Sequence, residues 1–369
     1  MQKRIQELDV LRVLAMLFVI TYHFGCEYAA AGLPFFNLFY LTPNYDFGNV
    51  AVTIFIALSG GLLYKKYGII DQGRCPAKSG MTNGVEKGEH FPLRTFYLKR
   101  AKAIYPPFWI LSLYIPLSML RHLIADGNAF FMGPPPTLLL TAIGFDGYAK
   151  MFGMDTYVFC GDWFVGAIVL LYLLYPLLAK CYAGHRLATI STLGVLYALQ
   201  YLIPAEHDEL FSILPVTIAF KFCIGFLLVE NLERFRNWRI AIIAAVALLA
   251  LTVIDIPGRI NTDFLGSATA IALFVVIFFV APRLLRIKAV SSIVPRLATL
   301  AYCVFLVQHV GIVWAQAASI KIFEKMHWNF SQWNVLALLA VTLVAIMFAA
   351  WILKMVSDQA TKRISKFLS

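Results

Sequence analysis

The sequence predicts an all-α, polytopic membrane protein with about ten transmembrane helices and both termini in the cytoplasm. Hydrophobic residues make up 60% of the chain and charged residues only 14%, against about 25% charged in soluble domains. Apolar runs long enough to cross about 30 Å of hydrocarbon recur along the whole chain. The ten expected spans are 8–25, 47–67, 103–123, 161–182, 187–203, 212–230, 239–256, 262–281, 297–319 and 334–357.

Basic residues are distributed unevenly between the two sides of this topology. Of the 31 Lys and Arg residues, 24 fall in segments placed inside, 5 fall in outer loops, and Arg12 and Lys221 lie within spans. This excess of inside charge supports ten spans with cytoplasmic termini. The net charge of +11 therefore reflects topology and attraction to anionic membrane lipids, and it does not indicate a nucleic-acid partner.

The first span carries two polar side chains, Arg12 and His23, in an otherwise apolar helix. Eleven residues at about 100° each make roughly three turns, so both side chains lie on one helix face about 16 Å apart. Because an arginine in hydrocarbon costs about 2.5–3.5 kcal/mol, we expect this face to line a polar cavity. Arginine suits phosphate or a thioester oxygen, and histidine moves protons at neutral pH. The pair predicts a catalytic axis through the membrane.

The same stretch has the outline of a secretory signal, with Lys3–Arg4 before the apolar run and Ala29–Ala31 after it. Arg12 within the run and the bulky Glu27 and Tyr28 beside the supposed cleavage site do not fit that pattern. We therefore expect the first helix to be retained.

The second and third spans flank a basic cytoplasmic loop. The second span ends in Ser59-Gly60-Gly61, small residues that permit close helix approach or an irregular backbone beside a ligand. The loop ends in Arg100 and Lys102, just before a span kinked by Pro106–Pro107. This arrangement predicts a basic cluster at the inner mouth of the bundle.

Polar residues are sparse in the later spans. Asp162 and Trp163 open the fourth span, and His309 lies within the ninth. Lys221 needs a partner or an aqueous cavity, which the sequence does not identify. Between the third and fourth spans, the stretch 134–144 begins with three prolines and predicts a re-entrant segment or a short lid helix.

Cysteine spacing and nucleotide motifs exclude several other classes of site. The six cysteines are Cys26, Cys75, Cys160, Cys181, Cys223 and Cys303, with no CxxC pair and no metal-like spacing. Cys26 and Cys160 are both expected near the outer face and can pair in an oxidising compartment, although small apolar packing is the favoured interpretation. No P-loop, dinucleotide fingerprint or zinc signature occurs. We expect no metal, no permanently bound cofactor and one membrane domain over residues 1–369.

Taken in order, these motifs resemble acyltransferase family 3, the integral-membrane acyltransferases that modify surface glycans, lipids and some small molecules. Leu8-Asp9-Val10-Leu11-Arg12 and His23 match the family's opening Leu-Asp-x-Leu-Arg stretch and the histidine eleven residues after its arginine. The later segments that resemble family motifs are Phe55–Gly61, Phe96–Trp109, Trp163–Pro176 and Tyr302–His309. The resemblance spans nearly the whole chain.

The chain departs from the family pattern at two places. Ala103 stands where many relatives have a second arginine, with Lys102 beside it. The helix around Ala167 has no carboxylate where some relatives have a glutamate, and Asp162 is the nearest acid. These differences leave the substrate subfamily open.

The resemblance implies an acyl-coenzyme A donor, with acetyl-coenzyme A expected, and we expect the activity of an O-acetyltransferase. In that reaction we expect His23 to take the proton of the acceptor hydroxyl and Arg12 to hold a donor phosphate or carbonyl. Arg100 and Lys102 are expected to anchor nucleotide phosphates, and Ser59 to donate to the thioester oxygen or to carry the acyl group. Further candidates are His309, Asp162 and Trp163.

Each candidate also has a structural interpretation. Arg12 can reach lipid headgroups, and a membrane histidine often makes only an interhelical hydrogen bond. Ser59 can serve close helix packing, while Arg100 and Lys102 can act simply as determinants of topology.

Two other function classes remain open from the sequence. A transporter or flippase for a glycan or lipid-linked precursor also has about ten spans, but the break at Pro106–Pro107 has no counterpart in the other half of the chain. An intramembrane serine protease built on Ser59 and His309 would leave Arg12 unexplained.

The expected acceptor is a hydroxyl of a cell-surface glycan, glycolipid or related small molecule, and the expected location is the plasma (inner) membrane. The outer loops 29–46 and 130–160 are rich in aromatic residues and carry Asp46, Asp146 and Asp155. Such loops fit a sugar-facing surface, and they fit a membrane-interface belt equally well. Neither the acyl chain length nor the oligomeric state is indicated.

Overall fold

The computed structural model describes residues 4–37, 41–68, 93–158, 162–200, 208–254 and 262–367, and within these ranges it contains helices and no β-strand. The predicted all-α class is confirmed. In chain order the helices are α1 (Gln6–Ala30), α2 (Phe47–Tyr67), α3 (Leu93–Ser112), α4 (Tyr114–Asp126), η2 (Pro135–Thr137), α5 (Leu138–Ile143), α6 (Asp146–Lys150), α7 (Asp162–Gly184), α8 (Arg186–Leu199), α9 (Asp208–Phe211), α10 (Pro215–Glu230), η5 (Leu232–Arg236), α11 (Trp238–Val253), α12 (Thr262–Leu284), α13 (Lys288–Met326) and α14 (Gln332–Phe367).

Short polar signals in the sequence set several of these helix ends. Asp46 caps α2, because its carboxylate accepts the backbone N–H of Asn49 at 2.7 Å. Asn237 caps α11 in the same way, accepting from the backbone of Arg239 at 2.9 Å. Gly127 ends α4 in the left-handed conformation that glycine adopts without strain.

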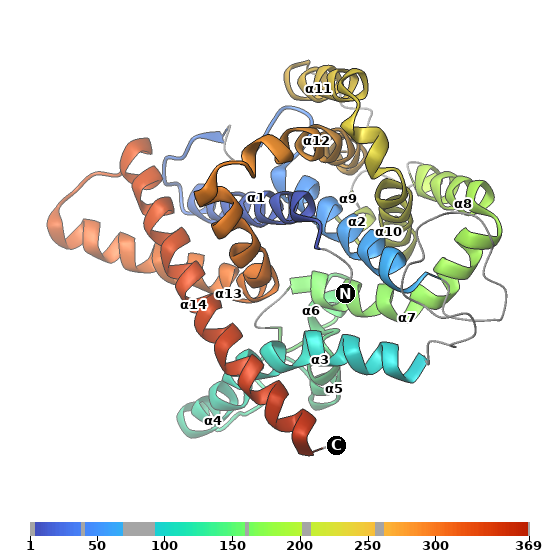
Figure 1. Cartoon of the computed structure of the whole chain (residues 1–369). Coiled ribbons are helices and arrows are strands. Elements are labelled where there is room, and N and C mark those ends of the chain that lie inside the picture. Colours follow the sequence, from blue (N-terminus) through green and yellow to red (C-terminus); the bar gives the residue numbers. More distant parts are fainter. Residues whose placement is uncertain are drawn as a thin grey trace.

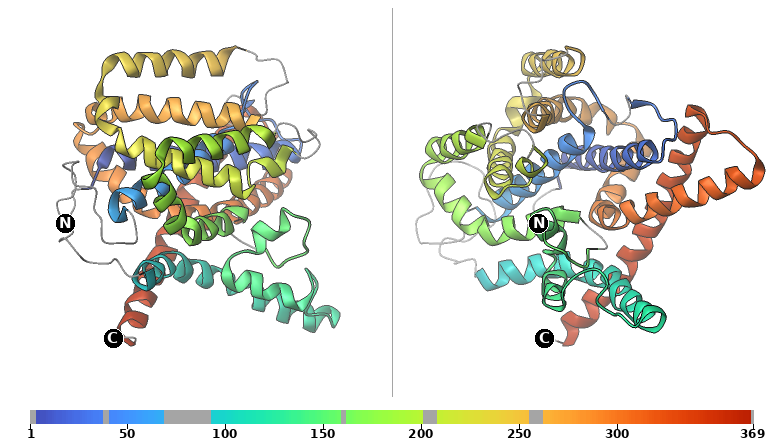
Figure 2. Two further views of the ribbon diagram at one scale, coloured as in Figure 1. Left: turned by 90° about the vertical axis from the view of Figure 1, so that its right-hand side faces the viewer. Right: turned by 180° about the vertical axis from the view of Figure 1, so that it is seen from behind.

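Helix α1 lies at the centre of the bundle, in contact with α2, α12 and α13 (Figure 1). Its buried residues include Leu11, Val19 and Phe24. Figure 2 shows α11 at the periphery of the bundle, where Ile243 and Leu249 are exposed. An apolar helix with so much exposed hydrocarbon side chain is suited to contact with lipid.

Among the described residues, each of the ten predicted spans coincides for most of its length with one or two helices. Seven helical stretches among the described residues are long and apolar enough to cross a membrane, and α8 and α11 are shorter apolar helices. The third predicted span, 103–123, covers the end of α3 and most of α4. The number ten and the side of each terminus stay predictions.

The directions of the central helices are consistent with ten crossings of the membrane. Arg4 donates to the carbonyl of Pro295 at 3.0 Å, and the hydroxyls of Tyr28 and Ser319 lie 3.2 Å apart, so α1 and α13 run parallel. Ten crossings make these helices the first and the ninth, which run in the same direction. If only the seven long stretches crossed, α13 would be the sixth and would oppose α1. The parallel register therefore requires an odd number of further crossings, a condition that three crossings by α8, α10 and α11 would satisfy.

The predicted role of Gly60 and Gly61 in close helix approach is confirmed. A Cβ on Gly60 would collide with the carbonyl oxygen of Phe222, and one on Gly61 would collide with Val229. On the facing helix, Gly225 lies equally close to the backbone of Ala57. Small residues on both helices thus let α2 and α10 pack backbone to backbone.

Lys221, left without a partner by the sequence, forms a buried ion pair. Its Nζ lies 2.6 Å from Oδ1 of Asp263 on α12, and the side chains are 2% and 4% exposed. The hydroxyl of Tyr197 donates to the other oxygen of Asp263 at 2.5 Å. Removing one partner of a buried pair costs about 3–5 kcal/mol, so this triad holds α8, α10 and α12 together.

The proline-rich stretch between the third and fourth spans forms η2 and then the short helix α5, which ends at Gly144. A Cβ on Gly144 would lie within 3.1 Å of Val165 on α7. The segment is therefore a short helix that packs on α6 and meets α7 at its end, and no observation distinguishes a lid from a re-entrant segment.

Cysteine labelling of intact cells tests the two-sided topology. In a cysteine-free background, Lys99→Cys should react only with a permeant reagent, while Asp155→Cys should also react with an impermeant reagent, because both positions are exposed but lie on opposite predicted sides. Reaction of both variants with the impermeant reagent would contradict the ten-span arrangement.

Candidate functional site

Arg12 is held by an acidic residue one turn earlier on α1. Asp9 is 2% exposed and accepts hydrogen bonds from Arg12 at 3.0 Å and from Arg4 at 2.5 Å. Arg12 is therefore not an isolated charge, and the acidic residue of the opening motif explains how the helix tolerates it. The Arg12 side chain is 26% exposed, and a guanidinium has five N–H donors, so donors remain for a ligand.

Arg100, on α3, lies against two tyrosines. Its guanidinium carbon lies 5.8 Å from the ring centre of Tyr67 and 5.7 Å from that of Tyr172 on α7. The Nε atom of Arg100 is buried and has no hydrogen-bond partner among the described residues. At least one donor of this arginine is therefore unused.

Lys102 differs from Arg100 in its surroundings. The two residues are two positions apart, which turns their side chains by about 200° around the helix axis. Arg100 is half-buried against the two tyrosines, whereas Lys102 is exposed. The structure therefore brings Arg100, but not Lys102, toward the bundle interior.

At the outer half of α1, His23 meets the second predicted histidine. The rings of His23 and His309 lie 5.6 Å apart in an edge-to-face arrangement. Nε2 of His309 lies 3.8 Å from a carboxylate oxygen of Glu27, and Gln316 donates to the backbone carbonyl of Glu27 at 2.6 Å. The structure thus joins His23, His309 and Glu27 in one cluster between α1 and α13.

Ser59 lies on the face of α2 that turns toward α7 and α13. It follows Phe55 by four residues, so both share one face, and the ring of Phe55 lies 6.2 Å from that of Phe164. Phe164 in turn lies 4.7 Å from Phe305 on α13. In the predicted topology α2 runs from the outer to the inner side, and Ser59 is then one turn closer to the cytoplasm than this aromatic layer.

Two further candidates begin α7. Trp163 is partly buried against the hydrophobic core, and its ring centre lies 6.1 Å from that of Phe164. Asp162 is the first residue of the helix, but its side chain lies outside the described part of the structure, as do Cys75 and Cys160. The possible pairing of Cys26 with Cys160 therefore stays untested.

The three outer carboxylates have different environments. Asp46 is occupied as the cap of α2, and Asp146 is 2% exposed, so burial raises the pKa of its carboxyl to about 6. Asp155 is exposed. Of the three, only Asp155 is open to an acceptor on the outer face.

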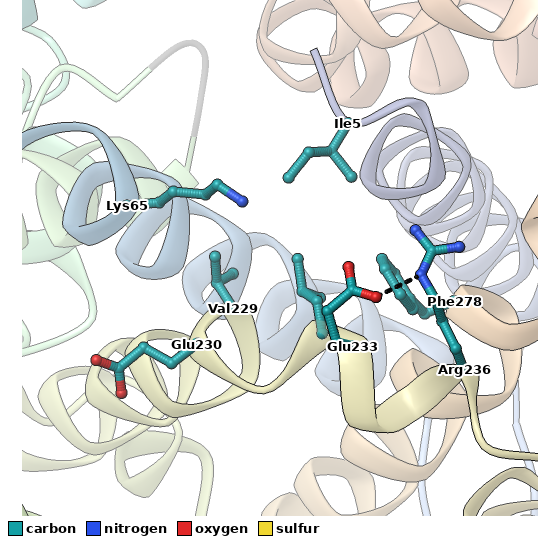
Figure 3. Close-up of a pocket in the computed structure, with 8 residues that line it drawn as sticks. Ile5, Lys65, Val229, Glu230, Glu233, Arg236 and Phe278 are labelled. Carbon is teal, nitrogen blue, oxygen red and sulfur yellow. Dashed lines mark ion pairs between the residues drawn. The ribbon is translucent and has the colours of Figure 1, made fainter. Parts of the chain in front are cut away.

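A small pocket at the inner ends of α1, α2 and α10 has a different character from the arginine region (Figure 3). Its Arg236 pairs with Glu233 at 3.1 Å and with Glu7 at 3.2 Å, while Glu230 binds Arg186 at 2.9 Å. Lys65 extends toward the pocket from α2. Acids and cations are equal in number here, which makes the pocket a poor site for a polyanion.

The candidate site therefore has two levels along α1. Arg12 and Arg100 offer donors for anions toward the side predicted to be inner, and the His23 cluster can exchange protons toward the side predicted to be outer. Three residues that contribute to these contacts were not predicted from the sequence: Asp9, Glu27 and Tyr172.

Comparison with known proteins identifies the family of the chain. A family model described as an acyltransferase domain matches residues 5–355 of the chain. No curated protein and no solved structure gives a significant match.

Proposed function

Since the chain belongs to acyltransferase family 3, we propose that this membrane acyltransferase moves an acyl group from acyl-coenzyme A to a hydroxyl of a surface glycan, glycolipid or related small molecule. Acetyl is the expected group and the plasma membrane the expected location. The family assignment favours this function over a transporter and over a serine protease. The observation that carries the proposal is the placement of Arg12 and His23 at two levels of the central helix.

The inner level suits the donor. Phosphates carry the charge of coenzyme A, and arginines bind phosphate through paired N–H donors. Arg12 comes from α1, and Arg100 comes from α3, where it lies against Tyr172; we propose that both arginines contact the donor. Arg12 keeps Asp9 as its internal partner, which leaves its remaining donors for a phosphate or a pantetheine carbonyl.

The outer level suits proton transfer. A general base must lie near the acceptor hydroxyl at the moment it attacks the thioester carbon. His23 has an imidazole at this level, and His309 and Glu27 surround it. With the base about 16 Å along the helix from Arg12, an extended donor arm held at the inner level can bring its thioester to an acceptor that enters from the outer side.

The direct test is acyl transfer by the full chain in lipid vesicles. Labelled acetyl-coenzyme A should pass its label to lipid or glycan fractions and release free coenzyme A. Labelled succinyl- and longer acyl-coenzyme A in parallel define the acyl group. Absence of transfer from every donor, with folded protein present, would contradict the proposed function.

The affinity for coenzyme A should distinguish the role of Arg100 from that of Lys102. Arg100→Glu should weaken coenzyme A binding by about 10–100-fold, because a charge-assisted hydrogen bond worth about 1.5–3 kcal/mol is lost. Lys102→Glu makes the same charge change on the exposed side of α3 and should alter binding by less than about threefold. Calorimetry with coenzyme A measures both. Equal weakening would restore Lys102 as a donor contact, and no change in either would leave both as topology determinants.

A further inference from the structure

Gln308 on α13 is a buried amide without partners. Its side chain is 0% exposed, and neither its Nε2 nor its Oε1 has a hydrogen-bond partner among the described residues. At membrane depth such a group has no bulk water to bind, so leaving it unpaired is unfavourable. A buried side chain with two unused hydrogen-bonding atoms is best explained by a ligand that enters the site.

The position of Gln308 relates it to the proposed base. It follows Phe305 by three residues, so it shares the face of α13 that meets Phe164 in the bundle interior. The next residue, His309, lies against His23. Nδ1 of His309 is also buried without a partner among the described residues. Unused polar atoms thus gather at the level of His23.

The directions of α2 and α13 place Gln308 and Ser59 on opposite sides of the aromatic layer formed by Phe55, Phe164 and Phe305. Phe18 of α1 stacks on Phe47 at the start of α2, with ring centres 4.8 Å apart, and Ile5 shares a pocket with Lys65 near the end of α2. Helix α2 therefore opposes α1, and it also opposes α13, which is parallel to α1. Starting from the aromatic layer, Ser59 lies a turn toward the inside and Gln308 a turn toward the outside. Gln308, and not Ser59, is on the side of the base.

We propose that the amide N–H of Gln308 binds the carbonyl oxygen of the acyl thioester and stabilises the oxyanion that forms there. This inference rests on the proposed acyl transfer. The acceptor oxygen bonds to the thioester carbon, the C=O electron pair moves onto oxygen, and His23 takes the hydroxyl proton. When the oxyanion collapses, the C–S bond breaks, and the coenzyme A thiolate leaves and receives the proton from His23. Gln308 acts through its N–H, since the amide cannot exchange protons at neutral pH.

The test removes the amide and keeps its volume. Gln308→Leu should lower kcat for acyl transfer by about 10²–10³-fold, the usual effect of losing one oxyanion donor. Its KM for acyl-coenzyme A should change little, because the donor phosphates bind elsewhere. The melting temperature should not fall, since an unpaired buried amide is replaced by an apolar group.

Gln308→Met provides a second apolar replacement, and Thr269→Val serves as the matched control. The hydroxyl of Thr269 on α12 is also buried without a described partner, so its removal tests the loss of an unpaired buried polar group on a helix other than α13. The control should keep wild-type kcat. Transfer within threefold of wild type in either Gln308 variant would overturn the proposal while the proposed function stands. Failure of both variants to fold would assign Gln308 a structural role instead, and absence of transfer by the wild-type chain would overturn the underlying function.

Discussion

His23→Ala should lower acyl transfer by about 10²–10⁴-fold, the range that a general base contributes. A methyl group cannot accept the proton of the acceptor hydroxyl, so the attacking oxygen remains a weak nucleophile. Donor binding should persist, because Arg12 and Arg100 lie at the other level of the bundle. The measurement is label transferred from acyl-coenzyme A per mole of folded protein, together with coenzyme A affinity in the same preparation.

His122→Ala is the matched control for this variant. His122 lies on α4 and pairs with Asp126 at 2.9 Å, so the same substitution removes an imidazole remote from α1. It should keep wild-type transfer. Near-normal transfer by His23→Ala would contradict a catalytic role and return His23 to an interhelical hydrogen bond. Loss of coenzyme A affinity together with transfer would instead indicate that the substitution disturbs the donor site.

The helices, and the helix face that Arg12 and His23 share, could be predicted from the sequence because both depend on residues that are close together in the chain. Hydropathy over about 20 residues identifies a span, and a repeat of 3.6 residues places two side chains on one face. The ion pair between Arg12 and Asp9 could also have been predicted from the sequence, since Asp9 precedes Arg12 by three residues and such pairs face one another on a helix.

The missed contacts join residues that are distant in the chain. Lys221 and Asp263 lie on α10 and α12, and nothing in either local pattern indicates that these helices are neighbours. The same holds for Glu27 with His309, and for Arg100 with Tyr172. Gln308 resembled any polar residue in a span until the packing around it showed that its amide is buried and unpaired. Helix packing therefore decides which polar residues meet, and a single sequence does not specify it.

Arg12→Lys should lower kcat/KM for acyl-coenzyme A by about 10–100-fold, although the charge is retained. Lysine replaces a planar fork of donors with a point charge and cannot bind Asp9 and a donor oxygen in the same geometry. Losing one hydrogen bond to a charged group corresponds to about 1.5–3 kcal/mol, which sets the expected range. The fold should persist, because Asp9 keeps its 2.5 Å contact with Arg4.

Arg4→Lys is the matched control, because it makes the same substitution at a different position. Arg4 binds the same carboxylate, but its side chain is 47% exposed and lies at the start of the chain, so a lysine there keeps both its charge and its access to water. Steady-state kinetics of both variants should show a large loss for Arg12→Lys and a change below about threefold for Arg4→Lys. An arginine that only reaches toward lipid headgroups would tolerate lysine well. Equal, small effects at both positions would therefore remove Arg12 from the donor site and leave Arg100 as its remaining arginine.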